Sequence, residues 1–321
     1  MIYILIFGIL FLLEFFYFKV ADRFNIIDKP NERSSHTSLT LRGGGIIFYF
    51  GALAYFIYSG YQYPWFFLGL TLMTLVSFLD DILTLSNKIR LFIHFGSVLL
   101  MTYQLDLFNL PWYYLLITFI IVVGVINAYN FMDGINGITA CYSISVTCLL
   151  MIVNSKISFV DQKLLSFSLI AVLVFSFFNF RKTAKTFAGD VGSVAIAYIL
   201  LFAIGALIIN TGNLIYILFL TVYGIDAVWT IIRRLSLKEN IFAAHRSHLY
   251  QYLGNEAGVN KLLISFLYGL IQFLIGLSVI WISNYDLSIQ VIYAVSLLVG
   301  ISIVYLIIKS FVIKNFVLNK V

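Results

Sequence analysis

The sequence predicts an all-α integral membrane protein, a helical bundle of about eleven transmembrane helices, and two observations support this fold class. Of the 321 residues, 62% are hydrophobic and only 11% are charged, against roughly 25% charged residues in an ordinary soluble domain. Apolar runs of about 15 to 20 residues follow one another along the chain, separated by short polar breaks. The runs are continuously apolar rather than alternating, which excludes a β-barrel.

Each apolar run is interpreted as one helix, because a helix satisfies its own backbone groups in lipid. The first run lacks a basic start and a small-residue cleavage site, so we interpret it as a retained span and not a signal peptide. The runs are centred near residues 10, 52, 71, 99, 119, 146, 171, 201, 222, 272 and 298. We expect a single transmembrane domain, 1–321, with cytoplasmic loops at 19–44, 80–94, 127–137, 180–193 and 233–261.

The charges of the breaks predict the orientation of the chain. Of the 20 Lys and Arg residues, all but Lys156 and Lys163 fall on one face when eleven spans alternate across the bilayer. The positive-inside rule places that face in the cytoplasm, so we expect the N-terminus outside and the C-terminus inside. The net charge of +6 forms no continuous stripe, which argues against nucleic acid as a partner. Cys141 and Cys148 share one apolar run and indicate neither a disulfide nor a metal pair.

Two acidic breaks on the predicted cytoplasmic face are candidates for metal binding. Asp80 and Asp81 end the third span, where adjacent carboxylates need a counter-charge such as a divalent cation. The alternative is a solvated helix end beside Lys88 and Arg90. Asp190 directly precedes the eighth span, where it could cap the helix or hold a metal bound to phosphate.

A third polar stretch follows the fifth span. Asn127, Asn130 and Asp133 recur at three-residue spacing, which keeps them on one side of a helix. Gly134 and Gly137 then allow the backbone to approach a ligand or a neighbouring helix. An ordinary Asn- and Gly-containing turn is the alternative interpretation.

The late break at 233–261 contains two of the four histidines. His245 and His248 flank Arg246, and no Cys or carboxylate stands close by to complete a zinc set. We therefore interpret this loop as phosphate-binding, with a metal site as the alternative. The first break adds Arg33 and the stretch Arg42–Gly45, which taken alone would be an ordinary positive-inside loop.

The interpretation of these clusters as binding sites is strengthened because all of them lie on the predicted cytoplasmic face. Four carboxylates at the same membrane boundary, with Arg, Lys and His side chains around them, match a magnesium-bound diphosphate. Carboxylates hold the metal in such a site, and basic side chains and helix N-termini hold the phosphate oxygens. The carboxylates are Asp80, Asp81, Asp133 and Asp190, and the basic residues are Arg33, Arg42, Lys185, Arg246, His245 and His248.

The order and spacing of the four motifs resemble those of the polyprenyl-phosphate N-acetylhexosamine-1-phosphate transferases, over about residues 20 to 260. This family of bacterial glycosyl transferases, family 4, includes enzymes that start O-antigen and teichoic acid linkage synthesis and, more distantly, the phospho-N-acetylmuramoyl-pentapeptide transferase of peptidoglycan. The resemblance implies an enzyme that transfers a sugar 1-phosphate from a UDP-N-acetylhexosamine to undecaprenyl phosphate and releases UMP. It further implies dependence on Mg²⁺, with Mn²⁺ as a substitute.

The resemblance also implies roles for individual residues. Asp81 and Asp190 correspond to the metal ligands, Asp80 to the first acid of the pair, and His245 and His248 to the essential late histidines. Substrate-binding residues are expected along the nucleotide and phosphate sites, with Phe187 stacking on the uracil; they are Asn127, Asn130, Asp133, Lys185, Phe187, Arg246 and Arg42.

The chain departs from the family pattern in three places. Asn136 stands where the family usually has a second Asp, Leu39 and Leu41 stand where prolines precede Arg-Gly-Gly, and Thr183 replaces the Pro of Pro-Ala-Lys. Lys185 keeps the charge of that last motif.

Two mechanisms and several substrates stay open. The ionised lipid phosphate is already a nucleophile near neutral pH, so direct attack on the β-phosphate is preferred over a double displacement through Asp80. The late loop resembles that of the O-antigen-initiating branch more than that of the peptidoglycan enzyme, and this resemblance implies N-acetylfucosamine or a related 6-deoxy sugar. A secondary transporter is the alternative from another class, but only Glu14 and Asp226 lie inside spans and no repeat is visible. The expected setting is the bacterial cytoplasmic (inner) membrane, with membrane lipid and a second copy of the chain as further partners.

Overall fold

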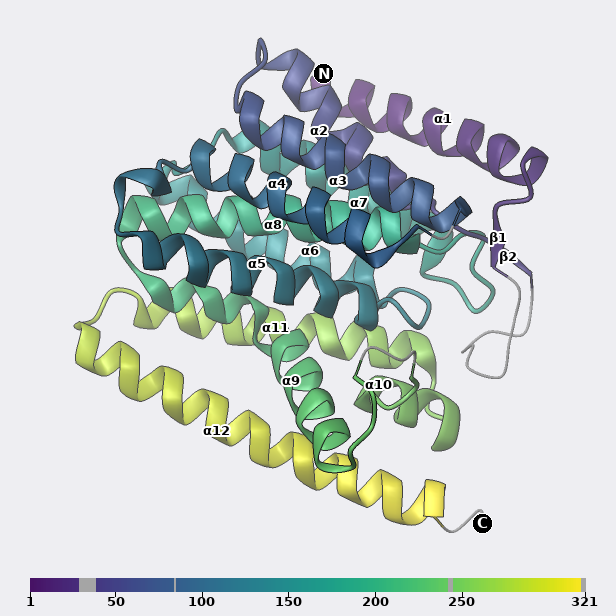
Figure 1. Ribbon diagram of the computed structural model, residues 1–321, viewed down its shortest axis with the longest axis vertical. Coiled ribbons are helices and arrows are strands. Elements are labelled where there is room, and N and C mark those ends of the chain that lie inside the picture. The colour runs from purple at the N-terminus through teal and green to yellow at the C-terminus, as the bar shows by residue number, and fades with distance from the viewer. Residues whose placement is uncertain (29–38, 84, 242–244, 319–321) are drawn as a thin grey trace.

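The computed structural model describes residues 1–28, 39–83, 85–241 and 245–318, and most of them are helical (Figure 1). The α-helices are α1 (Ile2–Arg23), α2 (Ile46–Tyr58), α3 (Pro64–Leu83), α4 (Asn87–Gln104), α5 (Trp112–Met132), α6 (Ile138–Ile157), α7 (Gln162–Asn179), α8 (Gly189–Thr211), α9 (Thr221–Ser236), α10 (Leu249–Gln251), α11 (Lys261–Ile282) and α12 (Leu287–Val312). Short irregular helices are η1 (Leu107–Asn109), η2 (Leu214–Leu220), η3 (Tyr252–Glu256) and η4 (Ile313–Val317). Strands β1 (Ile27–Asp28) and β2 (Thr40–Leu41) pair antiparallel.

The predicted fold class is confirmed. Each of the eleven predicted centres falls within a helix, and nine helical segments in the described part of the chain are long and apolar enough to cross a membrane. The other two are α2, which has 13 residues, and α4, which begins with the polar sequence Asn87-Lys88-Ile89-Arg90. The protein is therefore an all-α multi-pass membrane protein, while the number of eleven crossings stays a prediction.

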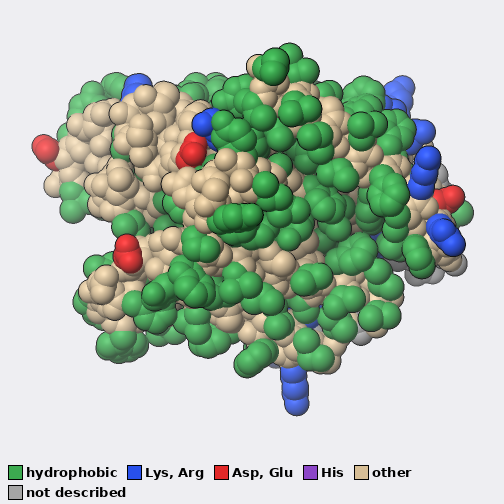
Figure 2. Space-filling view, turned by 90° about the horizontal axis from the view of Figure 1, so that it is seen from above, with side chains coloured by type: hydrophobic (Ala, Val, Ile, Leu, Met, Phe, Trp, Pro, Cys, Tyr) green, Lys and Arg blue, Asp and Glu red, His purple; other side chains and the backbone are tan. Residues whose placement is uncertain are grey.

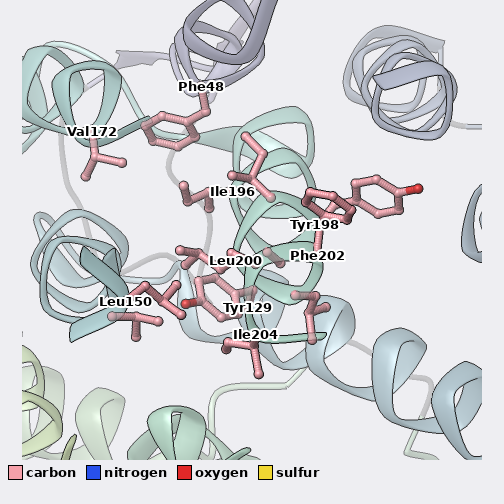
Figure 3. Close-up of a cluster of buried hydrophobic side chains, with 14 of the residues drawn as sticks. Phe48, Tyr129, Leu150, Val172, Ile196, Tyr198, Leu200, Phe202 and Ile204 are labelled. Atoms are coloured by element: carbon pink, nitrogen blue, oxygen red, sulfur yellow. The ribbon is translucent and has the colours of Figure 1, made fainter. Parts of the chain in front are cut away.

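Helix α8 is the centre of the bundle. About 78% of its most apolar window is buried, the largest share among the nine candidate spans. Figure 3 shows Ile196, Leu200 and Ile204 of α8 among side chains from α2, α5, α6 and α7, such as Phe48 and Tyr129. Helices α2, α3, α5 and α6 pack against α8, so this packing sets the position of α8 relative to them.

Helix α12 lies at the periphery and contrasts with α8. Only 6% of its most apolar window is buried, and Figure 1 shows it crossing beside α9 at the edge of the bundle. A helix that is apolar and exposed on most of its surface is suited to face lipid. One of its side-chain contacts with α9 is the hydrogen bond from the Trp229 indole N–H to Ser302 Oγ, 2.9 Å long.

The polar breaks gather at the two ends of the bundle. Figure 2 shows apolar side chains over the middle of one face, with most of the visible Lys and Arg side chains at one end. At that end Leu41 forms a bridge with Thr186, and the Tyr250 hydroxyl donates to the Phe131 carbonyl. These contacts join the first break to the loop before α8, and the late loop to the end of α5.

The orientation in the membrane generates a test by cysteine labelling. In a variant with Cys141 and Cys148 replaced by Ser, we expect Ser158→Cys to react with a membrane-impermeant maleimide in intact cells. Lys238→Cys should react only after the membrane is opened, because it lies at the Lys- and Arg-rich end. Both positions are exposed in the structure. The reverse labelling pattern would place the carboxylate cluster outside the cell.

Candidate active site

The carboxylate of Asp81 joins the end of α3 to the beginning of α8. Its two oxygens accept the backbone N–H groups of Asp190, at 3.2 Å, and Val191, at 3.1 Å. The first amides of a helix have no partner within the helix and carry the positive end of its dipole, so a carboxylate stabilises them. The capping group of α8 is therefore Asp81, and not Asp190 as the alternative interpretation had it.

Two arginines bind the carboxylates around this helix end. One nitrogen of Arg42 lies 2.8 Å from an Asp81 oxygen and 3.1 Å from an Asp190 oxygen. Arg90 lies 2.7 Å from Asp80 and 3.7 Å from the second oxygen of Asp190. The Asp81 side chain has no exposed surface, whereas 18% of the Asp190 side chain is exposed. Asp190 is therefore the more accessible of these two carboxylates to a ligand.

Glycines let the backbone of the first break approach α8 closely. The amides of Gly44 and Gly45 donate to the carbonyls of Phe187 and Ala188, at 2.9 and 3.2 Å. A Cβ atom on Gly45 would clash with the Cα atom of Gly192 in α8. Arg42–Gly45 is therefore more than the ordinary positive-inside loop that its sequence alone indicates, because it packs against the first turn of α8.

The polar stretch at the C-terminal end of α5 contacts the same helix end. Asn130 accepts the Ser193 hydroxyl at 3.0 Å, and Asp133 accepts the Thr139 hydroxyl at 2.6 Å. Burial raises the pKa of Asp133 to about 6, and the nearby Asp190 adds to this effect. Asn127 instead donates to the Val123 carbonyl of its own helix, at 2.8 Å.

Asn136, the residue that departs from the family pattern, holds the loop between α7 and α8. Its side-chain amide donates to the carbonyls of Arg181, at 2.8 Å, and Lys182, at 3.1 Å. Its own carbonyl accepts the Ser265 hydroxyl of α11 at 2.8 Å. A carboxylate cannot donate to two carbonyls, so this position requires an amide in this arrangement.

The late loop forms a second cluster. The His245 and His248 rings are stacked with centroids 5.1 Å apart, and Nδ1 of His248 lies 3.2 Å from the Asp226 carboxylate. His248 is only 2% exposed, so it is not the surface-loop residue that its sequence context indicates. Burial lowers the pKa of His245 to about 4, with His248 and Arg234 adding to the effect, so this ring is neutral near pH 7.

The end of α5 contacts both the carboxylate cluster at the N-terminus of α8 and the histidine cluster of the late loop. The Phe131 ring lies 6.0 Å from the His245 ring and 6.3 Å from the His248 ring. Asn130 and Asp133, on either side of it in the chain, contact α8 and α6. The carboxylates and the histidines therefore flank one helix end, which is the convergence expected of a single site.

The remaining candidate residues lie at the rim of this region. Lys185 is exposed, and the half-buried Phe187 donates its backbone N–H to the Leu41 carbonyl at 2.8 Å. Arg246 is paired with Glu256 at 2.7 Å, which reduces the positive charge of the late loop. Arg33, a predicted basic residue of the site, lies in 29–38, outside the described residues.

Two residues of the site carried no sequence signal strong enough to assign them. The sequence indicates Arg90 only as a neighbour of the acidic pair, yet it binds both Asp80 and Asp190. The sequence indicates Asp226 only as an ionisable residue inside a span, and in the structure it accepts the Thr230 hydroxyl at 3.2 Å. Its contact with His248 spans 22 residues of sequence and has no local pattern.

Comparison with known proteins supports the resemblance. A family model described as glycosyl transferase family 4 matches residues 63–211, which contain the acidic motifs. A probable undecaprenyl-phosphate N-acetylglucosaminyl 1-phosphate transferase of Bacillus subtilis is 28% identical over 86% of this chain and 84% of the relative. An undecaprenyl-phosphate alpha-N-acetylglucosaminyl 1-phosphate transferase of Yersinia pestis is 29% identical over 79% of this chain and 75% of the relative. A phospho-N-acetylmuramoyl-pentapeptide-transferase of Kosmotoga olearia is 35% identical over 30% of this chain and 29% of the relative.

Asn136 provides a test of the site's architecture. We expect Asn136→Asp to destabilise the folded protein by about 2 kcal/mol, because the new carboxylate would face two carbonyl oxygens without a proton to donate. The matched control is Asn284→Asp, whose amide also donates to two carbonyls but is exposed to solvent. Thermal unfolding in detergent measures both, and equal stability of the two variants would contradict the assigned role of Asn136.

Proposed function

From this confirmed similarity to glycosyl transferase family 4, we propose that the protein transfers N-acetylhexosamine 1-phosphate from a UDP-sugar to undecaprenyl phosphate. The observation that carries the proposal is the convergence of Asp81, Asp190, Arg42 and Arg90 at the N-terminus of α8. Such an arrangement of carboxylates, arginines and helix amides is suited to a metal-bound diphosphate. The products are UMP and a lipid-linked sugar that begins a cell-surface glycan.

Asp81 and Asp190 are the residues proposed to hold Mg²⁺. They fit that ion because two oxygen ligands already converge on one cation, the Arg42 guanidinium, which is within 3.1 Å of both. Mg²⁺ typically uses one or two carboxylates and completes its shell with water and substrate phosphates. When bound, it supplies neutralisation of the charge on the diphosphate.

The arginines and the helix end act on the substrates. Arg42 and Arg90 place positive charge beside Asp190, where two anionic phosphates have to meet. The phosphate of the acceptor is largely ionised near neutral pH, since its second pKa is about 6, so it attacks without a strong general base. Holding both phosphates in line supplies most of the rate acceleration in such a reaction.

The environment of Asp80 favours direct transfer over a covalent intermediate. One oxygen of Asp80 accepts the Leu85 backbone N–H at 2.7 Å, and the other is paired with Arg90 at 2.7 Å. A carboxylate with both oxygens bound and 9% of its side chain exposed is a poor nucleophile. Asp80 is therefore proposed to orient Arg90, and the acceptor phosphate to attack the β-phosphate of the donor.

The donor sugar and the setting complete the proposal. The names of the relatives favour N-acetylglucosamine among the N-acetylhexosamines, over the 6-deoxy sugar favoured by the late loop. The acidic cluster faces the cytoplasm, where a UDP-sugar is available, in the cytoplasmic membrane of a bacterium. A transporter would move its substrate without cleaving it, so release of UMP separates the two classes.

The reaction itself is tested with purified protein, Mg²⁺, undecaprenyl phosphate and a panel of UDP-N-acetylhexosamines. We expect a lipid product whose mass has increased by one N-acetylhexosamine 1-phosphate, with one UMP released for each product. The UDP-N-acetylglucosamine reaction should be the fastest of the panel. Absence of UMP with every donor, in protein that is folded, would contradict the proposed function.

The stability of the Asp190→Asn and Asp81→Asn variants distinguishes the roles of the two residues. Asp190→Asn should lower turnover by more than about a thousandfold while changing stability by only about 1 kcal/mol, because its ion pairs are partly exposed. Asp81→Asn should lose activity and also about 3 kcal/mol of stability, because a fully buried carboxylate holds two helix amides and Arg42. The control is Asp286→Asn, an exposed residue at the start of α12. Wild-type turnover in folded Asp190→Asn would remove that residue from the metal site.

A further inference from the structure

A buried hydrogen-bond network lies beneath the late loop, centred on Asp226 of α9. The carboxylate is 1% exposed, although Asp226 lies in an apolar helix where an unpaired charge is costly. It accepts hydrogen bonds from five groups, which are the backbone N–H of Leu249 and the side chains of Thr230, His248, Tyr268 and Tyr305, at 2.9 to 3.2 Å. The network therefore joins α9, α10, α11 and α12.

The hydrogen bonds of this network determine which ring nitrogen of His248 carries the proton. An ionised carboxylate can only accept, so Nδ1 of His248 must donate to Asp226. The backbone N–H of His248 donates to Gln251 at 3.2 Å, and its ring stacks between those of His245 and Tyr250. Nε2 is buried and has no partner among the described residues. Nε2 is thus the atom of this ring left to meet a ligand.

Helix α12 adds two polar side chains to this network. Lys309 is 3% exposed, and its ammonium donates to Thr230 at 2.8 Å and to Tyr305 at 2.6 Å. Both acceptors in turn contact Asp226, so the lysine places a positive charge one residue away from the carboxylate. Since most of α12 faces outward, these inward-facing residues are the exception on that helix.

We propose that Asp226 is a positioning residue for the transfer reaction, which fixes the orientation and the tautomer of His248. We propose further that Tyr305 and Lys309 of α12 hold Asp226 in place. A carboxylate that orients a histidine in this way sets which nitrogen carries the proton and which faces the substrate. The inference rests on the proposed function for its substrate, because Nε2 of His248 would face the phosphates of the donor.

The tautomer is measured directly by nitrogen NMR of protein labelled with ¹⁵N-histidine. The chain has four histidines, and the His248 signals are identified by their loss in His248→Gln. In wild-type protein above neutral pH we expect His248 with Nδ1 protonated and Nε2 bare. Asp226→Ala, which removes the acceptor, should shift the population toward the Nε2-protonated form. Asp226→Asn keeps an acceptor oxygen and should preserve the wild-type tautomer.

Variants that change the tautomer of His248 should also lower kcat. Asp226→Ala is expected to lower kcat by about a hundredfold, with KM for the UDP-sugar within about twofold, and Asp226→Asn should restore part of the loss. Tyr305→Phe is the milder variant and should lower kcat about fivefold. Its control is Tyr293→Phe on the same helix, which removes a hydroxyl that contacts Ser278 and not the Asp226 network, and should leave kcat unchanged.

Two results would overturn the inference. One is an unchanged His248 tautomer in Asp226→Ala, and the other is an equal loss of kcat in Tyr305→Phe and Tyr293→Phe. If Asp226→Ala does not fold, the comparison of the two tyrosine variants decides. If wild-type protein yields no UMP, the proposed function fails, but the NMR experiment still decides whether Asp226 sets the tautomer of His248.

Discussion

The hydrogen bonds between Asp81 and the first amides of α8 are the interaction on which the site depends. They connect the end of α3 to the most buried helix of the bundle, and they place a carboxylate where a helix dipole favours negative charge. Gly189 has a left-handed φ of 70°, and a Cβ atom there would lie 2.8 Å from an Asp81 oxygen. The glycine thus allows the carboxylate to reach the helix end.

Arginines balance the negative charge of the carboxylates that this contact brings to the membrane boundary. Arg42 bridges Asp81 and Asp190, and Arg90 bridges Asp80 and Asp190, so each carboxylate of this group has a guanidinium partner. The late loop is different, because His245 is neutral and Arg246 is paired with Glu256. The histidines are therefore suited to direct hydrogen bonding, and the arginines near α8 to charge neutralisation.

The sequence was sufficient for the fold class, because the fold class depends on local patterns. Continuous apolar runs predicted the helices, and the position of each acidic motif at the end of a run predicted the shared end of the bundle. The roles within the site depend on contacts between distant residues. That Asp81 caps α8 across 109 residues, and that Asp226 binds His248, are results of packing that no spacing encodes. Asn136 appeared to be a lost carboxylate, and the structure shows an amide with two carbonyl acceptors.

The central claim is that the carboxylates at the N-terminus of α8 bind a divalent cation together with the diphosphate of the donor. Electron paramagnetic resonance of Mn²⁺, with detection of its coupling to phosphorus nuclei, measures both parts at once. We expect one bound Mn²⁺ per chain in the presence of UDP, coupled to ³¹P, and loss of this coupled signal in Asp190→Asn. Coupled Mn²⁺ of equal affinity in folded wild-type protein and Asp190→Asn would contradict it.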